Sequence, residues 1–302
     1  MFVFPLLRLR PLFRSLACLV LLVLWGLTVG ETPAQTTTPP RPAARSARAA
    51  PVPAPDPAIT KLLTEALALQ ADYHESQALS RYEQVLAKAP ATYEALWRAA
   101  VLSVRIGNRY TDETRKAAYF SAARLYANRA LVVNPDGAEG HYAAGLTLAT
   151  QAPLLPLRGR LLAYREMRTH VYQATELRPD WAEAWQLLGR WHYRVDHYSL
   201  LERLYSRLFL GGVPVGGSTL LALEALRTAH ALDSTRIEYA YDLARVHLNR
   251  SQQTRATAVL QAAVELTPVT ADELVVSRQC RLLLEQLNRR QRRQVQRYLK
   301  KL

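Results

Sequence analysis

The sequence contains 302 residues with a formal net charge of +14, and only 12 of its residues are glycine. This length suits one elongated repeat domain with appended segments. Alanine and leucine dominate, and alternating runs of β-branched residues are absent. The composition therefore predicts an all-α protein and argues against an architecture built on a β-sheet.

The amino terminus has the pattern of an export signal. The charged residues before Glu31 are Arg8, Arg10 and Arg14, and the fifteen residues 16–30 are apolar and uncharged. A bilayer span takes about 20 apolar residues, so this segment is short for one. We therefore expect residues 1–30 to be a signal peptide and the protein to be exported, either periplasmic or secreted. The alternative is a signal anchor that holds the protein in a membrane through residues 16–30.

Residues 31–57 have the composition of a tether. They include eight prolines among alanine, threonine and arginine, so they cannot bury a core and are expected to be extended and disordered. Cys280 is the only cysteine beyond the signal segment, which excludes an intrachain disulfide once the signal is removed. We expect its thiol to be buried as a small apolar side chain.

The clearest repeat pattern follows Pro179. Trp185, Leu188, Gly189 and His192 are spaced i, i+3, i+4 and i+7, which places them on one helical face. The small Gly189 allows a second helix to approach this face closely. The spacing resembles the first helix of a tetratricopeptide repeat, W-x2-L-G-x2-Y, with His192 in the place of the usual tyrosine.

Five residues fall where such repeats end, and they are Pro90, Pro135, Pro179, Ser234 and Pro268. Small or apolar residues, including Ala123 and Ala263, occupy the preceding second-helix positions where paired helices cross. This pattern predicts an all-α, tetratricopeptide-like helical repeat solenoid. We expect it to be right-handed, to contain five helix pairs over residues 58–287 and to have no β-sheet.

The periodicity of hydrophobic residues predicts where the helices lie. Those of the five pairs are expected over 58–69, 75–88, 92–106, 112–133, 138–149, 163–177, 181–193, 219–232, 236–249 and 254–266. The longest interval between repeat ends accommodates an additional amphipathic helix over 199–209 and a glycine-rich loop over 211–217. Residues 271–299 are expected to form a helix that caps the last apolar face.

Several longer motifs resemble one known family. They are Leu96-Trp97-Arg98, the helix over 119–133 ending in Asn134-Pro135, the segment 187–193, Leu201-Glu202-Arg203, and 208–214. Together they resemble the regulator of microtubule dynamics family over about residues 71–287. The resemblance implies an all-α fold, no catalytic site, and association of animal members with microtubules or organelle membranes. Leu200 and Leu201 depart from the aromatic residues usual there, and export would separate the protein from microtubules, so that activity is kept as an alternative.

Motifs for catalysis, cofactors or metals are absent from the sequence. It contains no H-E-x-x-H, no C-x-x-C and no G-x-S-x-G. His141, His192 and His247 fall at interior positions of first helices, which favours packing over metal ligation. We therefore expect no cofactor, no metal site, no catalytic residue and no enzymatic activity. An enzyme of the cell envelope without a recognisable motif remains the alternative.

The first helices of the repeats are expected to line a concave groove. Aromatic and arginine side chains, which are typical binding anchors, recur at the groove positions. The candidate partner-binding residues are Trp97, Arg105, Tyr142, Gln186, Arg190, Tyr193, Arg194, Tyr241 and Arg245. They predict a scaffold of the bacterial cell envelope that binds a peptide or a helix of a partner protein.

Within this set, Trp97, Tyr142 and Tyr241 share one helix position, so we expect them to form a row with Trp97 as the main anchor. Arg190 and Arg245 are expected to pair with acidic groups of the ligand. The alternative is that inserted helices, or the protein's own carboxyl-terminal helix, fill the groove.

The carboxyl-terminal segment 288–302 is strongly basic. Residues Arg289 to Lys301 carry seven positive charges and no acid. A solvated helix end, favoured by the helix dipole, is the simpler interpretation. The alternative is a patch that binds an anionic membrane surface. Nucleic acid is not an expected partner, because export and the scarcity of aromatic residues in this segment argue against it.

Overall fold

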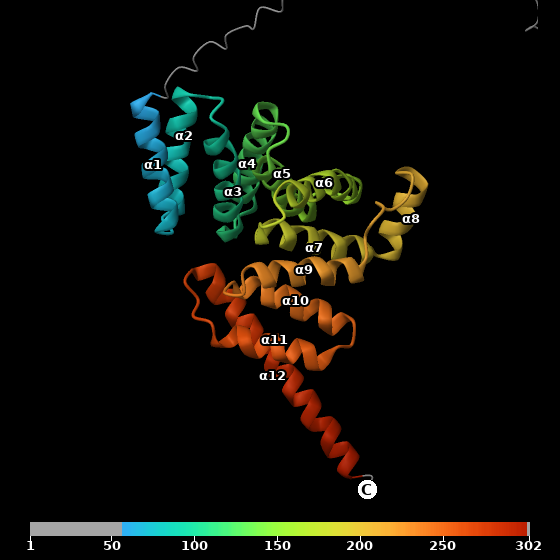
Figure 1. Ribbon diagram of the computed structural model, residues 1–302. Coiled ribbons are helices and arrows are strands. Elements are labelled where there is room, and N and C mark those ends of the chain that lie inside the picture. The colour runs from blue at the N-terminus through green and yellow to red at the C-terminus, as the bar shows by residue number, and fades with distance from the viewer. Residues whose placement is uncertain (1–55, 301–302) are drawn as a thin grey trace, which may run out of the picture. The chain divides into compact units, whose positions relative to one another are not determined.

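The structure is a computed structural model, and it describes residues 56–300 (Figure 1). The expected signal peptide and almost all of the expected tether lie outside these residues. The first helix begins at Pro57, the last residue of that tether, where the Asp56 side chain accepts a hydrogen bond from the Ala58 N–H at 2.8 Å. A proline in the first helical turn gives up an N–H that has no partner there.

The described residues form an all-α structure without strands, which confirms the predicted fold class. The five helix pairs are α1 (Pro57–Ala71) with α2 (Glu75–Lys88), α3 (Tyr93–Arg109) with α4 (Glu113–Val133), α5 (Ala138–Gln151) with α6 (Leu157–Leu177), α7 (Ala182–Asp196) with α9 (Thr219–Leu232), and α10 (Ile237–Asn249) with α11 (Gln253–Glu265). The other helices are α8 (Leu200–Phe209) and the terminal α12 (Ala271–Leu299).

Two segments differ from the sequence-based expectation. Helix α6 begins at Leu157, six residues earlier than expected, because Pro156 marks the break and the helix starts directly after it. The segment before it, where no helix was predicted, contains the short 3₁₀ helix η1 (Ala152–Leu154). Both differences lie at helix ends, where local signals are weakest.

Small side chains allow the paired helices to approach closely. Ala123, Ala127 and Ala130 of α4 are fully buried, and Ala263 of α11 is 1% exposed. At Gly189 of α7, an added Cβ would lie 2.6 Å from Leu226 Cγ of α9. A larger residue at this position would therefore push α7 away from α9, which is the physical reason for glycine in the W-x2-L-G pattern.

The two elements outside the pairs have different surroundings. The first half of α12 packs on α10 and α11 and buries Cys280 and Leu287, so the expectation for Cys280 is confirmed. Its basic carboxyl-terminal half extends beyond the other helices (Figure 1), and its described arginines are exposed. Helix α8 projects at one side of the repeats. Between residues 56 and 300, no helix has the length and the apolar composition needed to span a membrane.

A histidine pair joins α5 to α6. The Nδ1 atoms of His141 and His170 are 3.0 Å apart, and His141 Nε2 donates to the Pro135 carbonyl oxygen at 2.8 Å. The Nδ1 atom of His141 therefore accepts a hydrogen bond from the Nδ1–H group of His170. Burial, and then the nearby His141, lower the pKa of His170 to about 4. His141, His192 and His247 are all buried, as expected for packing positions.

The close contact at Gly189 leads to a stability prediction. We expect Gly189→Ala to lower the free energy of unfolding by about 1–3 kcal/mol, because the new methyl group must displace Leu226. Gly159→Ala is the matched control, since its Cβ would meet only the Leu155 side chain, at 3.3 Å; the control should be neutral or slightly stabilising. Urea unfolding measures both, and equal effects would show that the α7–α9 crossing tolerates a methyl group.

The histidine pair leads to a prediction about pH. The pKa of His170 is lowered in the folded protein from its ordinary 6.5, so the unfolded state binds more protons between pH 6.5 and about 4, and stability falls as the pH falls through that range. Allowing for partial exposure, we expect a loss of about 1–2 kcal/mol from this residue. Urea unfolding at several pH values should show a smaller loss for His170→Asn, whose amide can still donate to His141. An unchanged slope would contradict this assignment.

Candidate functional site

The first helices of repeats two to five line a hollow of about 710 Å³, which we call the central groove. Its walls come from the carboxyl-terminal part of α3, from α5 and α7, and from the start of α10. The first turn of α12 completes the lining. Of the predicted site residues, Arg105, Tyr142, Gln186 and Arg190 line this groove.

Ion pairs close one end of the central groove. Arg109, at the end of α3, contacts Glu75 at 2.6 Å and Asp272 of α12 at 2.8 Å. Arg105 contacts the same Glu75 at 3.4 Å. These contacts join α2 and α3 to a helix that follows about 160 residues later. Arg109 and Asp272 were not among the predicted site residues, because no local pattern marks a contact over such a separation.

The start of α12 is also attached to α10. Glu273 is 6% exposed; it contacts Arg236 at 3.0 Å and accepts the Val269 N–H at 2.9 Å. The protein's own carboxyl-terminal helix therefore forms one wall of the groove but leaves its interior open. The hydroxyl of Tyr239, which also lines the groove, is buried and has no hydrogen-bond partner among the described residues.

Two predicted binding residues are already engaged inside the protein. Asp242 of α10 is 8% exposed. It accepts from Gln186 Nε2 at 2.8 Å and from Arg190 Nε at 2.5 Å. The pairing expected between Arg190 and an acidic ligand is thus made with an internal carboxylate, and a buried carboxylate requires such partners.

Next to the groove lies the tyrosine pocket, a hollow of about 410 Å³ between α7, α10 and α12. It contains Tyr193, Tyr241 and Arg245 beside the apolar Leu226, Val246 and Val276. Arg245 is exposed, lies 5.7 Å from the Tyr241 ring centroid, and makes no ion pair within the part of the chain that the structure describes. It is therefore the predicted arginine that stays available to a ligand.

Arg194 is engaged as well, although it borders the tyrosine pocket. It contacts Glu202 of α8 at 2.5 Å and lies 5.1 Å from the ring centroid of Tyr164. Tyr193 stacks on His197 with ring centroids 4.1 Å apart. These contacts hold the α7 side of the pocket in place, so Tyr241 and Arg245 are its more adaptable members.

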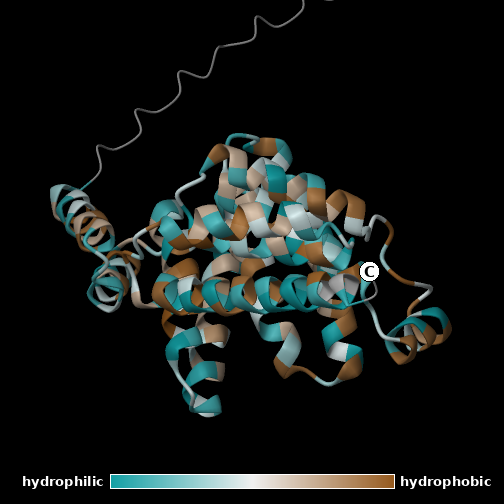
Figure 2. Ribbon diagram, turned by 90° about the horizontal axis from the view of Figure 1, so that it is seen from below, coloured by the Kyte–Doolittle hydropathy of each residue, from teal (hydrophilic) through white to brown (hydrophobic). Residues whose placement is uncertain are grey.

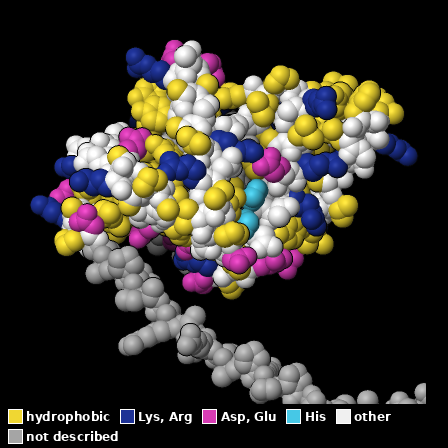
Figure 3. All heavy atoms as spheres, turned by 90° about the horizontal axis from the view of Figure 1, so that it is seen from above, with side chains coloured by type: hydrophobic (Ala, Val, Ile, Leu, Met, Phe, Trp, Pro, Cys, Tyr) yellow, Lys and Arg dark blue, Asp and Glu magenta, His cyan; other side chains and the backbone are white. Residues whose placement is uncertain are grey.

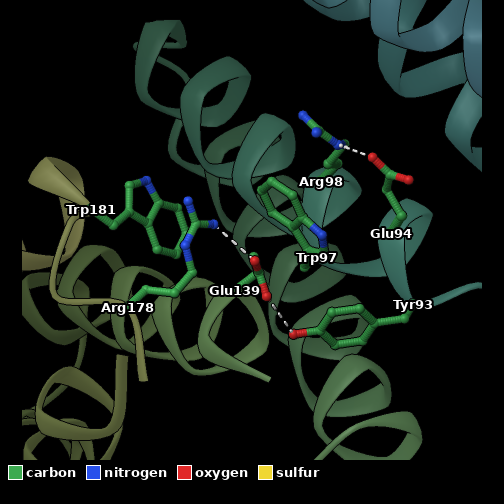
Figure 4. A pocket seen from close by; sticks show the side chains of 7 residues that line it. All are labelled: Tyr93, Glu94, Trp97, Arg98, Glu139, Arg178 and Trp181. Atoms are coloured by element: carbon green, nitrogen blue, oxygen red, sulfur yellow. Dashed lines mark hydrogen bonds and ion pairs between the residues drawn. The ribbon is translucent and has the colours of Figure 1, made fainter. Parts of the chain in front are cut away.

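A third hollow, the tryptophan pocket, has a volume of about 460 Å³ and contains Trp97 (Figure 4). Trp97 comes from α3, whereas Trp181 and Arg178 come from the turn before α7. Each indole ring is covered by a guanidinium group, Arg98 at 4.4 Å and Arg178 at 4.6 Å. Cation–π stacking of this kind holds both tryptophans in fixed orientations.

Carboxylates complete the tryptophan pocket. Glu94 contacts Arg98 at 3.1 Å, and Glu139 contacts Arg178 at 2.8 Å (Figure 4). Glu139 also accepts the Tyr93 hydroxyl at 3.2 Å, and that hydroxyl accepts the Gly140 N–H at 2.8 Å. Because the polar groups are paired and the indole faces are covered, Trp97 is positioned as a packing residue as much as a ligand anchor.

Three aromatic side chains form a row, as expected, but Trp181 takes the place of Tyr241 beside Trp97 and Tyr142. Trp181 lies between Trp97 and Tyr142, with ring centroids 6.3 Å and 4.5 Å away. Tyr241 lies apart, in the tyrosine pocket, and the equivalent position in the intervening repeat is Gln186. Trp181 was missed because it precedes its helix. The only local sequence feature that could have identified Trp181 as a member of the row is its position directly after Arg178-Pro179-Asp180.

Reactive groups in the structure are few. Within the described residues, no group of three or more His, Cys, Asp or Glu side chains is arranged to hold a metal ion. Burial raises the pKa of the Cys280 thiol to about 11, which opposes nucleophilic use because the thiolate is the reactive form. The three hollows combine aromatic rings with paired charges, an arrangement suited to holding a polypeptide segment.

The helix pairs, the small residues at their crossings and the concave groove define a tetratricopeptide-like helical repeat protein. The sequence profile of the family described as Regulator of microtubule dynamics protein 1-3 matches residues 62–288. The chain belongs to this family, as the sequence motifs predicted. A comparison with curated proteins gives no match.

One solved structure supports the fold, and two others are similar to the chain at lower TM-scores. TTC0263, a thermophilic TPR protein of Thermus thermophilus, superposes with a TM-score of 0.54 at 18% identity, over 74% of this chain and 99% of that one. PilF of Pseudomonas aeruginosa gives 0.46 at 15% identity, over 76% and 85%. YrrB, described as a TPR protein with an unusual peptide-binding site, gives 0.37 at 14% identity, over 73% and 98%.

The contrast between Arg190 and Arg245 leads to a prediction. Arg190→Ala leaves Asp242 with one donor fewer in a buried site, so we expect the free energy of unfolding to fall by about 1–3 kcal/mol. Arg245→Ala removes an exposed side chain without a carboxylate partner and should change stability by less than about 0.5 kcal/mol. Thermal or urea unfolding separates the two. If Arg190→Ala leaves the free energy of unfolding unchanged, the hydrogen bond from Gln186 alone is sufficient for the buried Asp242 carboxylate.

Proposed function

We propose that this protein is a non-enzymatic interaction scaffold that holds a segment of a partner protein in the central groove and the adjoining tyrosine pocket. The observation that carries the proposal is the free volume of about 710 Å³ that remains after α12 has formed its wall. Solenoids of helical repeats use concave surfaces of this kind for binding.

The chemistry of the hollows suggests the kind of segment that fits. The tyrosine pocket offers two aromatic rings, an aliphatic floor and the exposed guanidinium of Arg245, so it suits an apolar side chain next to a carboxylate. A bound peptide or helix would therefore be anchored by one apolar residue and positioned by polar contacts.

The cellular setting is part of this proposal. The amino-terminal pattern of arginines followed by residues 16–30 supports export, with the repeats placed in the periplasm or outside the cell, or held at a membrane by a retained anchor. The scaffold would then act on proteins of the cell envelope. Residues 289–301 supply a basic surface that would add contact with anionic lipid headgroups.

Family membership favours a second candidate function, a role in microtubule regulation. The family description names that activity, and the basic carboxyl-terminal helix offers charge complementarity to an acidic polymer. Co-sedimentation of the full chain with polymerised tubulin tests it directly. Pelleting that is lost when the arginines of 289–297 are replaced by glutamine would favour this candidate over the envelope scaffold.

Cross-linking in living cells is the experiment that tests the groove. A photoreactive phenylalanine at Tyr241 should yield a discrete cross-linked product with a partner protein. The same residue at Leu125 is the matched control, since Leu125 is 57% exposed on α4 and does not line any of the three hollows. Equal products from both positions, or none from Tyr241 in a folded and exported protein, would contradict groove binding.

Binding of the captured partner gives a quantitative prediction. We expect Tyr241→Ala and Arg245→Ala each to weaken it by about 1–3 kcal/mol. The effect of Arg245→Ala should shrink at high salt, because its contact is electrostatic, whereas that of Tyr241→Ala should persist. Isothermal titration at two salt concentrations measures both effects. Trp97→Ala is expected to lower stability as well as binding, since Trp97 packs against Trp181 and Arg98.

A further inference from the structure

Helix α8 turns its polar side toward the protein and its apolar side toward solvent, which is the reverse of a typical surface helix. The side chains it turns to the protein include Glu202 and Ser206, which are 6% and 1% exposed. Its leucines lie on the other side: Leu200, Leu201, Leu204 and Leu208 are 87%, 64%, 55% and 65% exposed. A surface helix normally buries its apolar stripe, so the sequence of α8 fits a helix whose apolar partner lies outside the described residues.

Polar contacts fix this orientation. Glu202 contacts Arg194 of α7 at 2.5 Å and Arg160 of α6 at 3.7 Å. Burial alone would raise the pKa of Glu202, but the hydrogen bonds from Arg194 and Ser199 outweigh it and hold the pKa below its ordinary value. Ser199 and Glu202 also form a capping box at the start of the helix. Rotating α8 to bury its leucines would expose Glu202 and break these contacts. The contacts of Glu202 therefore hold the leucines on the outer side of the helix.

The exposed charged side chains of α8 are positive. Arg203 and Arg207 are exposed on α8 beside the leucine face, while Phe209, at the end of the helix and 67% exposed, packs against Tyr205 with ring centroids 4.7 Å apart. Between residues 197 and 223 the only acidic residue is Glu202, which is buried. The end of the molecule where α8 lies in Figure 1 shows hydrophobic and basic side chains, with no acidic ones on the face seen in Figure 3.

A second copy of the chain fits this face poorly. Helix α8 has ten residues, so it is about 15 Å long. A stable protein–protein interface buries about 800 Å² on each partner, and one exposed helix face of this length supplies much less. Figure 2 shows α8 set apart from the other helices, which leaves few neighbouring surfaces to enlarge the contact.

We propose that α8 is a membrane-docking helix that inserts its leucine face into the surface of a bilayer containing anionic lipids. Leucines on one face with arginines at its border are the pattern of helices that lie in the interface plane. Arg203 donates to the Tyr198 carbonyl oxygen at 2.9 Å, so Arg207 would contact the lipid phosphates, and the leucines would enter the boundary of the acyl chains. The contact is limited to about three helical turns and is weak, so it requires the domain to be near a membrane by other means.

The signal anchor considered for residues 16–30 would supply such a means. These residues are apolar and follow three arginines, and residues 31–55 connect them to the first helix. An extended chain of this length reaches roughly 80 Å, so a retained anchor would allow α8 to meet the bilayer that holds it. Docking through α8 would then give the repeats a fixed orientation on the membrane.

A fluorescent label at α8 tests the proposal in the full chain. In a Cys18→Ser, Cys280→Ala background, Leu208→Cys carries an environment-sensitive nitrobenzoxadiazole probe, and Leu125→Cys on α4 carries the same probe as the control. The protein is mixed with vesicles of phosphatidylglycerol and phosphatidylcholine, and with vesicles of phosphatidylcholine alone. Because the readout is local to position 208, binding through the amino terminus does not produce it.

On the anionic vesicles, the label at 208 should brighten severalfold and emit at shorter wavelength, while the label at 125 should not change. Arg207→Gln should raise the lipid concentration for half-maximal response about fivefold, and Leu204→Glu should abolish the response. No change at 208 in vesicle-bound protein would overturn the proposal, as would an equal response on neutral vesicles. A response that grows with protein concentration without vesicles would overturn it in favour of a second copy.

Discussion

Close approach of paired helices at alanine and glycine is the constraint on which the structure depends. Gly189 has no room for a side chain beneath Leu226, and Ala123, Ala127 and Ala130 are fully buried where α4 meets its partner. Because each second helix is held against its first helix by such contacts, the first helices are left to face one another across the repeats. The central groove is the consequence of that stacking.

Arginine is abundant in this protein, and many of its arginine side chains form ion pairs with carboxylates of the same chain. Arg109, Arg190 and Arg236 each neutralise a buried or half-buried carboxylate near the groove. These contacts connect segments far apart in sequence, and they draw the start of α12 against the open side of the repeats. The high net charge therefore does not translate into a uniformly basic groove. Exposed arginines without an ion pair among the described residues include Arg245, Arg207 of α8 and Arg293 of α12.

The protein's own carboxyl-terminal helix occupies one side of the groove and leaves the rest of it open. Helix α12 forms a wall and supplies Asp272 and Glu273 to the lining, yet it stops short of filling the volume. Family membership over residues 62–288 and the superposition on a tetratricopeptide-repeat structure define the architecture.

Sequence alone determined the fold class, the helices and the crossing positions, because these depend on periodicity, on proline positions and on side-chain size within a few turns. It also identified part of the aromatic and arginine lining of the hollows, including Tyr142, Arg190 and Tyr241, but not Arg109 or Trp181. Only the tertiary structure decided how they are used: that Arg190 pairs with Asp242, that Trp181 completes the row begun by Trp97, and that α8 turns its leucines outward. These outcomes depend on how far the solenoid curves and which distant segments it brings within ion-pair distance. That curvature is the sum of many small packing angles, so no local sequence pattern records it.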